Sequence, residues 1–145
     1  MYGRFPTILC FFVLKKFKDW SAIVIGDEPR EKIFFKHPRL KILGFQTHTK
    51  VLKYLEKTSI AVVCSRWNEP FGRTSLEAAS RGCAVIISDR GGLKETITDG
   101  IIIKNLLPKV FSKNIKKLIL NPKLIKKVPS NSIKNFYLTT RSAAK

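Results

Sequence analysis

Acidic side chains are scarce in this chain of 145 residues, which carries ten Asp and Glu against 28 Lys and Arg. The last acidic residue is Asp99, so residues 100–145 hold eleven basic residues and no acidic ones. With a formal net charge of +18, the chain is attracted to phosphates and to anionic membrane surfaces. Charge runs are also common on solvated faces and tails, and the composition leaves both interpretations open.

Cysteines and long apolar runs are few as well. Cys10, Cys64 and Cys83 form no C-x-x-C pair, which argues against a disulfide framework and indicates reduced, mostly buried thiols. The longest apolar run, residues 8–14, has seven residues, whereas a membrane-spanning helix needs about 20. It also lacks the flanks of a signal peptide. We therefore expect a cytoplasmic protein.

Histidine and the larger aromatic residues are rare enough to argue against two further classes of site. Three Tyr and two Trp, none of them interleaved with basic residues in a motif, argue against a specific nucleic-acid binder. His37 and His48 have no partner at metal-ligand spacing, so we expect both on the surface. The chain has no zinc or calcium motif, and the sequence predicts no metal site.

Short runs rich in Val and Ile alternate with amphipathic stretches, a pattern typical of βαβ units. The predicted fold class is α/β, with a Rossmann-like, open, mostly parallel sheet and helices on both faces. The expected strands are residues 22–25, 40–43, 60–64, 84–88 and 101–103. The expected helices are residues 6–18, 49–57, 74–81, 93–96 and 108–120. We expect a folded domain over residues 1–120 and a basic tail over residues 121–145.

Two glutamates, Glu69 and Glu77, stand eight positions apart around a strand-to-helix loop in the stretch SRWNEPFGRTSLEAASRGCAV. Gly72 permits close approach of the backbone to a ligand, and the helix expected to begin at Thr74 offers free N–H groups that attract anions. Glu77 has two interpretations, since Thr74-x-x-Glu77 also matches a capping box. Glu69 follows a predicted strand in a polar loop, where ligand binding is its better explanation.

A second strand-to-helix loop, SDRGGLKETI, follows the next predicted strand and contains Gly91 and Gly92. Adjacent loops of this kind meet at the carboxyl ends of parallel strands, where open α/β sheets bind their ligands. Two glycine-containing loops beside one crevice fit a diphosphate.

The segment EPFGRTSLEAASRGCAVIISDRGGLKE closely resembles the donor-binding segment of the family 4 glycosyltransferases, which are retaining enzymes of GT-B fold. Its pattern is E-x7-E, then a G-x-P/A-V-I strand, then a G-G-x-x-E loop. Residues 19–29 and 39–66 are also similar to that family, so the resemblance covers most of residues 1–120. It implies the C-terminal, donor-binding half of a GT-B fold, with the N-terminal, acceptor-binding half absent.

The resemblance also implies roles for individual residues. Glu77 would bind the ribose hydroxyls of the donor nucleotide, and Glu69 would face the transferred sugar. Arg4, which follows Gly3, would bind the diphosphate, although apolar residues occupy the place of a nearby lysine of the family. Hydrogen-bond donors near the sugar and phosphates would come from Phe71, Gly72, Arg73 and Thr74. The loop at Gly44 and Phe45 would lie against the base.

The function implied by the resemblance is transfer of a hexosyl group from a UDP- or GDP-sugar to an acceptor hydroxyl, with retention and without a metal or other cofactor. The acceptor would be a glycan or lipid-linked glycan bound by the missing half, at the inner face of the membrane. We expect this chain alone to be inactive. Two alternatives remain, a non-catalytic nucleotide-binding module or fragment and a basic binder of membrane surfaces or nucleic acid.

Overall fold

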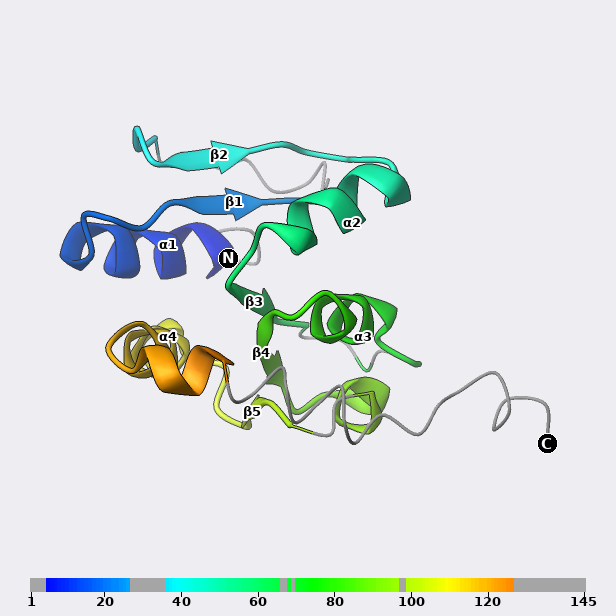
Figure 1. The fold of residues 1–145 in the computed structure, drawn as a ribbon. Helices are drawn as coiled ribbons and strands as arrows, with labels where there is room; N and C mark the ends of the chain where they lie inside the picture. Colours follow the sequence, from blue (N-terminus) through cyan, green and yellow to red (C-terminus); the bar gives the residue numbers. More distant parts are fainter. Residues whose placement is uncertain (1–4, 27–35, 66–67, 69, 97–98, 127–145) are drawn as a thin grey trace, which may run out of the picture.

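The computed structural model describes residues 5–26, 36–65, 68, 70–96 and 99–126. Helices and strands alternate along these ranges, except that β2 is the next described element after β1 (Figure 1). In chain order the elements are α1 (Phe5–Lys16), β1 (Ala22–Val24), β2 (Leu40–Ile42), α2 (His48–Glu56), β3 (Ile60–Val63), α3 (Arg73–Ser80), β4 (Ala84–Ser88), η1 (Gly91–Glu95), β5 (Ile101–Ile103) and α4 (Pro108–Ile119).

Every strand pairing in the described residues is parallel, as the alternation of strands and helices predicts. β1 pairs with β2, with Ala22 opposite Leu40. β3 pairs with β4 and β4 with β5, with Ile60 opposite Ala84 and Ile86 opposite Ile101. The predicted parallel α/β fold is confirmed, and each expected strand lies within one residue of the observed one.

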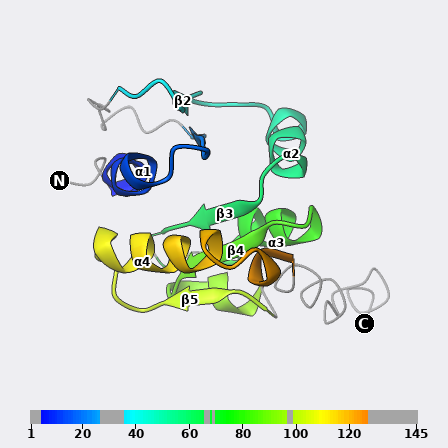
Figure 2. The same cartoon turned by 60° about the vertical axis from the view of Figure 1, so that its left-hand side comes forward.

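The strands differ from the single sheet that we predicted, because among the described residues they pair as two ladders, β1–β2 and β3–β4–β5. Written in the order β2-β1 and β3-β4-β5, the two ladders correspond to strands 3-2 and 4-5-6 of the doubly wound order 3-2-1-4-5-6. Strand 1 of that order, which would lie between the ladders, has no counterpart in the described ranges. Figures 1 and 2 show the two groups apart, with α1 at the level between β1 and β3.

The helices cover both faces of the strands, as predicted. α1 contacts α4 on one face, and α2 contacts α3 on the other, an arrangement best seen in Figure 2. β4 lies between these layers with all five residues buried. Because successive side chains of a strand point to opposite faces, Ala84 and Ile86 pack toward Phe111 of α4, while Val85 and Ile87 pack toward α3.

α4 continues this core toward the C-terminus. Its apolar stripe of Phe111, Ile115 and Leu118 is buried, as its helical spacing predicts. Leu124 and Ile125, in a helical stretch at residues 122–126, also pack against this core. No helix within the described ranges is both long enough and apolar enough to cross a membrane.

Arg39 joins the β1–β2 pair to α1 through a contact that the sequence pattern does not predict. Its guanidinium donates hydrogen bonds to the carbonyl oxygens of Leu14, Phe17 and Trp20, each at 2.6 Å. Carbonyls at the end of a helix lack partners within the helix and carry its negative partial charge, so a guanidinium is a suitable partner. Arg39 thereby fixes the end of α1 beside the first strand pair.

Candidate functional site

The loops that follow β1 and β2 lie side by side at the carboxyl ends of these strands. The N–H of Gly26 donates a hydrogen bond to the carbonyl oxygen of Gly44 at 2.9 Å. Both glycines have positive φ, +126° for Gly26 and +61° for Gly44, which favours glycine at these turns. The predicted base-side residue Phe45 follows and is 76% exposed. This loop therefore presents an aromatic ring to solvent at the edge where α/β sheets bind ligands.

The loops that follow β3 and β4 pack closely on each other, so the predicted convergence of two glycine-containing loops is observed. A Cβ on Gly92 would lie 2.5 Å from the carbonyl oxygen of Pro70. A Cβ on Gly72 would lie 2.5 Å from Leu93 Cδ2, and Gly72 also has a φ of +63°. Each glycine is therefore required by a close approach of the opposite loop.

Buried hydroxyl groups connect the same two loops. Ser75 Oγ lies 2.7 Å from Thr96 Oγ1 and 2.7 Å from the carbonyl oxygen of Gly72. Thr96 Oγ1 also lies 2.7 Å from the carbonyl oxygen of Leu93, to which it donates. Both side chains are almost fully buried, so these bonds satisfy polar groups that water cannot reach. The start of α3 is thus held against η1 by hydrogen bonds as well as by the glycine contacts.

The capping-box interpretation of Glu77 is wrong. α3 begins at Arg73, one residue earlier than predicted, and its N-cap is Gly72 with no side-chain hydrogen bond. Glu77 is then the fifth helical residue, too far along the helix to reach the N-cap N–H as a capping box requires. The carboxylate is directed instead to the side chains of His48 and Arg73.

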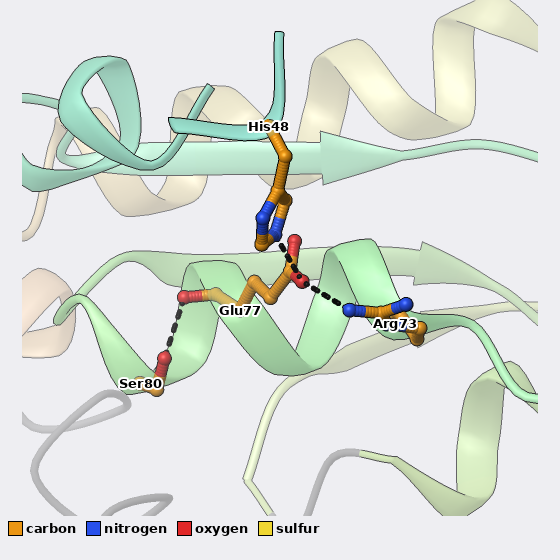
Figure 3. A network of polar contacts seen from close by, with 4 residues as sticks. All are labelled: His48, Arg73, Glu77 and Ser80. Carbon is orange, nitrogen blue, oxygen red and sulfur yellow. Dashed lines mark hydrogen bonds and ion pairs between the residues drawn. The ribbon is translucent and has the colours of Figure 1, made fainter. Parts of the chain in front are cut away.

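Glu77 lies at the contact between α2 and α3. Its Oε1 is 2.8 Å from Nε2 of His48, the first residue of α2, and 3.6 Å from Nη2 of Arg73, one turn earlier on α3 (Figure 3). Within the described ranges, no hydrogen-bond partner is found for Oε2. The glutamate side chain is 20% exposed, against 59% for His48 and 74% for Arg73. The Glu77 side chain is therefore mostly buried but keeps some contact with solvent.

His48 is a residue of this cluster that sequence reasoning missed. We expected His48 on the surface, and its side chain is indeed 59% exposed, but its ring also contacts Glu77 from 29 positions away. Two weak signals were present, because the residue directly precedes the helix expected at residues 49–57 and follows the Gly44–Phe45 loop assigned to the base. Spacing along the chain could not have revealed the contact.

The remaining predicted site residues are distributed as follows. Phe71 is 45% exposed, and the side chains of Arg73 and Thr74 are also exposed near the start of α3. One loop and helix thus hold Phe71, Gly72, Arg73, Thr74 and Glu77. Gly44 and Phe45 lie shortly before α2, whose first residue, His48, contacts Glu77. Glu69 and Arg4 lie outside the described residues.

The charges at this edge favour an anion. Arg73 is largely exposed beside Glu77, Arg90 ends the loop after β4, and Lys94 lies 3.4 Å from Asp89. α3 presents the free N–H groups of its first turn beside Arg73, since no side chain caps it. The arrangement offers cationic and N–H donors that suit phosphates, and the carboxylate of Glu77 suits hydroxyl groups.

The cysteines take no part in this site. All three have free thiols, and Cys83 is buried whereas Cys10 and Cys64 are only partly buried. Burial raises the pKa of Cys10 and of Cys83 to about 11, so both thiols are neutral near pH 7. Over the described ranges, no three or more His, Cys, Asp or Glu side chains are grouped to hold a metal ion.

The chain is similar to known glycosyltransferases. Its sequence is 32% identical over 92 residues to the lipopolysaccharide core biosynthesis mannosyltransferase LpsB of Rhizobium meliloti. The aligned region covers 57% of this chain and 26% of LpsB. The C-terminal domain of LpcC, a glycosyl transferase group 1 family protein of Francisella tularensis, is 28% identical with a TM-score of 0.76, over 90% of this chain and 75% of that one.

The fold is also that of Anabaena HepE, whose crystal structure contains UDP-glucose. The TM-score is 0.72 at 19% identity, over 91% of this chain and 40% of that one. This chain spans about a third or less of the length of the curated relatives that it matches. The sequence model of the family described as "Glycosyl transferases group 1" matches residues 8–135. The chain therefore belongs to the glycosyl transferases group 1 family.

Proposed function

We propose that this chain is the nucleotide-sugar-binding half of a family 4 glycosyltransferase of retaining mechanism. The observation that carries the proposal is the position of Glu77, near glycine-containing loops and at a helix whose start no side chain caps. One oxygen of its carboxylate is held by His48, and the other has no hydrogen-bond partner among the described residues. An ionised carboxylate accepts hydrogen bonds from hydroxyl groups, and helix N–H groups bind phosphate. A nucleoside diphosphate carries both of the groups recognised in this way, ribose hydroxyls and phosphates.

In this proposal each part of the donor has its own partners. Glu77 binds the ribose, and the exposed ring of Phe45 with the Gly44 turn lies against the base. Phe71, Gly72, Arg73 and Thr74 surround the phosphates and the sugar. Arg4 and Glu69, which lie outside the described residues, complete the site as partners of the diphosphate and of the transferred sugar.

The proposed reaction moves a hexosyl group to an acceptor hydroxyl with retention. The bond between the sugar carbon and the phosphate oxygen breaks, its electron pair remains on the diphosphate, and the acceptor oxygen forms the new bond to that carbon. The acceptor proton passes to the leaving phosphate. The chain supplies helix N–H groups and arginines that stabilise the charge on the diphosphate, so we propose that no metal is required.

The donor is proposed to be a UDP-sugar or a GDP-sugar. UDP-glucose is bound by HepE, which shares this fold, and LpsB is named as a mannosyltransferase. The acceptor is proposed to be a glycan or lipid-linked glycan that binds a second, N-terminal half. Since reacting groups must be held together for transfer, we expect no sugar transfer by these 145 residues alone.

The proposed location is the cytoplasm, at the inner face of the membrane. Exposed lysines at positions 109, 113 and 117 form a stripe along α4, and the exposed Leu107 and Leu120 flank it. Residues 100–126 contain no acidic residue that would offset this stripe, and the preceding acidic residue along the chain is Asp99. Basic side chains beside apolar ones suit an anionic lipid surface.

Binding of UDP and GDP, measured by calorimetry on the purified chain, tests the nucleotide proposal. We expect saturable binding of one nucleotide per chain, and binding that survives moderate salt better than that of a short oligonucleotide of the same charge. The alternative function, a basic surface binder, predicts the reverse order. Cosedimentation with vesicles of phosphatidylcholine, with and without phosphatidylglycerol, tests the lipid contact separately.

A further inference from the structure

His48 contacts the carboxylate of Glu77 from a different helix. It is the first residue of α2, and its ring crosses to α3, where Nε2 lies 2.8 Å from Glu77 Oε1 (Figure 3). To bind an ionised carboxylate at this distance, Nε2 must carry its hydrogen, so the imidazole is the donor. Among the described residues, no hydrogen bond or ion pair is found for Glu77 Oε2. One carboxylate oxygen is therefore held by a protein hydrogen bond, and the other has no such partner in the described part of the chain.

A glutamate side chain has several rotatable bonds, and restricting them on ligand binding costs free energy. The contact with His48 restricts them beforehand, because the backbone of the histidine belongs to the first turn of α2 and its side chain has only two rotatable bonds. Arg73 is a weaker support, since its Nη2 lies 3.6 Å from the same oxygen and its side chain is 74% exposed. An exposed pair on one helix contributes little.

From this geometry we infer that His48 is a positioning residue for nucleotide recognition, and that it makes discrimination between ribose and deoxyribose depend on the α2–α3 contact. The inference rests on the nucleotide binding proposed above. With Oε1 held by His48, Oε2 accepts a hydrogen bond from one ribose hydroxyl of the donor nucleotide. A nucleotide that lacks this hydroxyl gains nothing from the orientation of Glu77, and so its affinity does not depend on His48.

The test compares two substitutions with matched shape. His48→Leu removes the donor and keeps apolar bulk, whereas His48→Gln keeps an N–H donor at a similar distance from the backbone. Neither substitution removes a helix cap, because the N-cap residue Thr47 makes no side-chain hydrogen bond. Thermal melts of both variants check that folding is unchanged. The probes are UDP, 2′-deoxy-UDP and 3′-deoxy-UDP, with GDP and its deoxy analogues as the second set.

We expect the wild type to bind the ribonucleotide about tenfold or more tightly than one deoxy analogue, the range for a charge-assisted hydrogen bond. In His48→Leu the affinity for the ribonucleotide should fall about five- to tenfold while that for this analogue stays within about twofold, so that discrimination is lost. His48→Gln should restore most of it. A general loss of structure would instead weaken all nucleotides equally.

Three results would overturn the inference. If the wild type binds neither UDP nor GDP, the proposed function fails together with it. If the wild type discriminates against a deoxy analogue and His48→Leu retains that discrimination, the role of His48 is refuted and the proposed function stands. Tighter binding of the ribonucleotide by His48→Leu would show that the histidine competes with the ligand for Glu77.

Discussion

Replacement of Glu77 by glutamine separates ligand binding from helix stability. The substitution keeps the length of the side chain and an oxygen that can accept from His48, while it removes the negative charge. The helix start is unaffected, because Gly72 occupies the N-cap position of α3 and Glu77 makes no capping hydrogen bond there. The ion pair lost with the mostly exposed Arg73 is worth at most about 0.5 kcal/mol. We therefore expect little change in the free energy of unfolding.

The effect of Glu77→Gln on nucleotide affinity should be much larger. A hydrogen bond from a ribose hydroxyl to an ionised carboxylate contributes about 1–3 kcal/mol to the free energy of binding. Glutamine, which is neutral, should lose this contribution. The dissociation constant should rise about 5- to 150-fold for whichever of UDP and GDP binds the wild type. Isothermal titration calorimetry measures this change, and urea denaturation measures stability on the same samples.

Glu56→Gln is the matched control for this measurement. It makes the same change of charge on the exposed end of α2, where Glu56 pairs with Arg81 at 3.4 Å. Removal of any acidic residue makes a basic chain more attractive to an anion, so the control measures the nonspecific effect of charge. If Glu77→Gln and Glu56→Gln bind the nucleotide within about twofold of each other, the assignment of Glu77 to the ribose is refuted.

Two further predictions concern the framework that holds the site. Gly92→Ala should lower the free energy of unfolding by about 1–3 kcal/mol and weaken nucleotide binding, because the new Cβ would lie 2.5 Å from the carbonyl oxygen of Pro70. Urea denaturation measures this change, and an unchanged free energy of unfolding would contradict the prediction. Arg39→Ala should cost about 2–3 kcal/mol, because three carbonyls at 2.6 Å lose a charged donor. Arg39→Lys should recover less than half of that loss, since an ammonium group cannot reproduce the planar guanidinium; full recovery would show that charge alone matters.

Much of the fold could be predicted from local sequence, because its main signals are local. β4 was predicted at its exact bounds, since a short run of apolar residues between turn residues is typical of a central buried strand. α4 was predicted from its apolar stripe and from Pro108 at its first turn. The two glycine-containing loops were predicted to converge for the same reason, since parallel strands place their carboxyl ends at one edge.

The features that sequence analysis missed depend on contacts between distant parts of the chain. His48 meets Glu77 across 29 positions, and Arg39 reaches carbonyls 19 to 25 positions away. Neither pair has a local pattern. The separation of the strands into two ladders was missed for a related reason, since periodicity indicates that a strand exists but not which strand it pairs with. The capping box was wrong because Gly72 already provides the start of α3.

The central claim is that a donor nucleotide binds at the carboxyl ends of the strands, between the Gly44 turn and the start of α3. Titration of the 15N-labelled chain with UDP and with GDP, followed by two-dimensional NMR, tests it most directly. We predict saturable shifts of the backbone amide signals of Gly44, His48, Gly72 and Gly92 with one of the two nucleotides. Shifts confined to the lysine-bearing face of α4, or no saturable shift with either nucleotide, would contradict the claim.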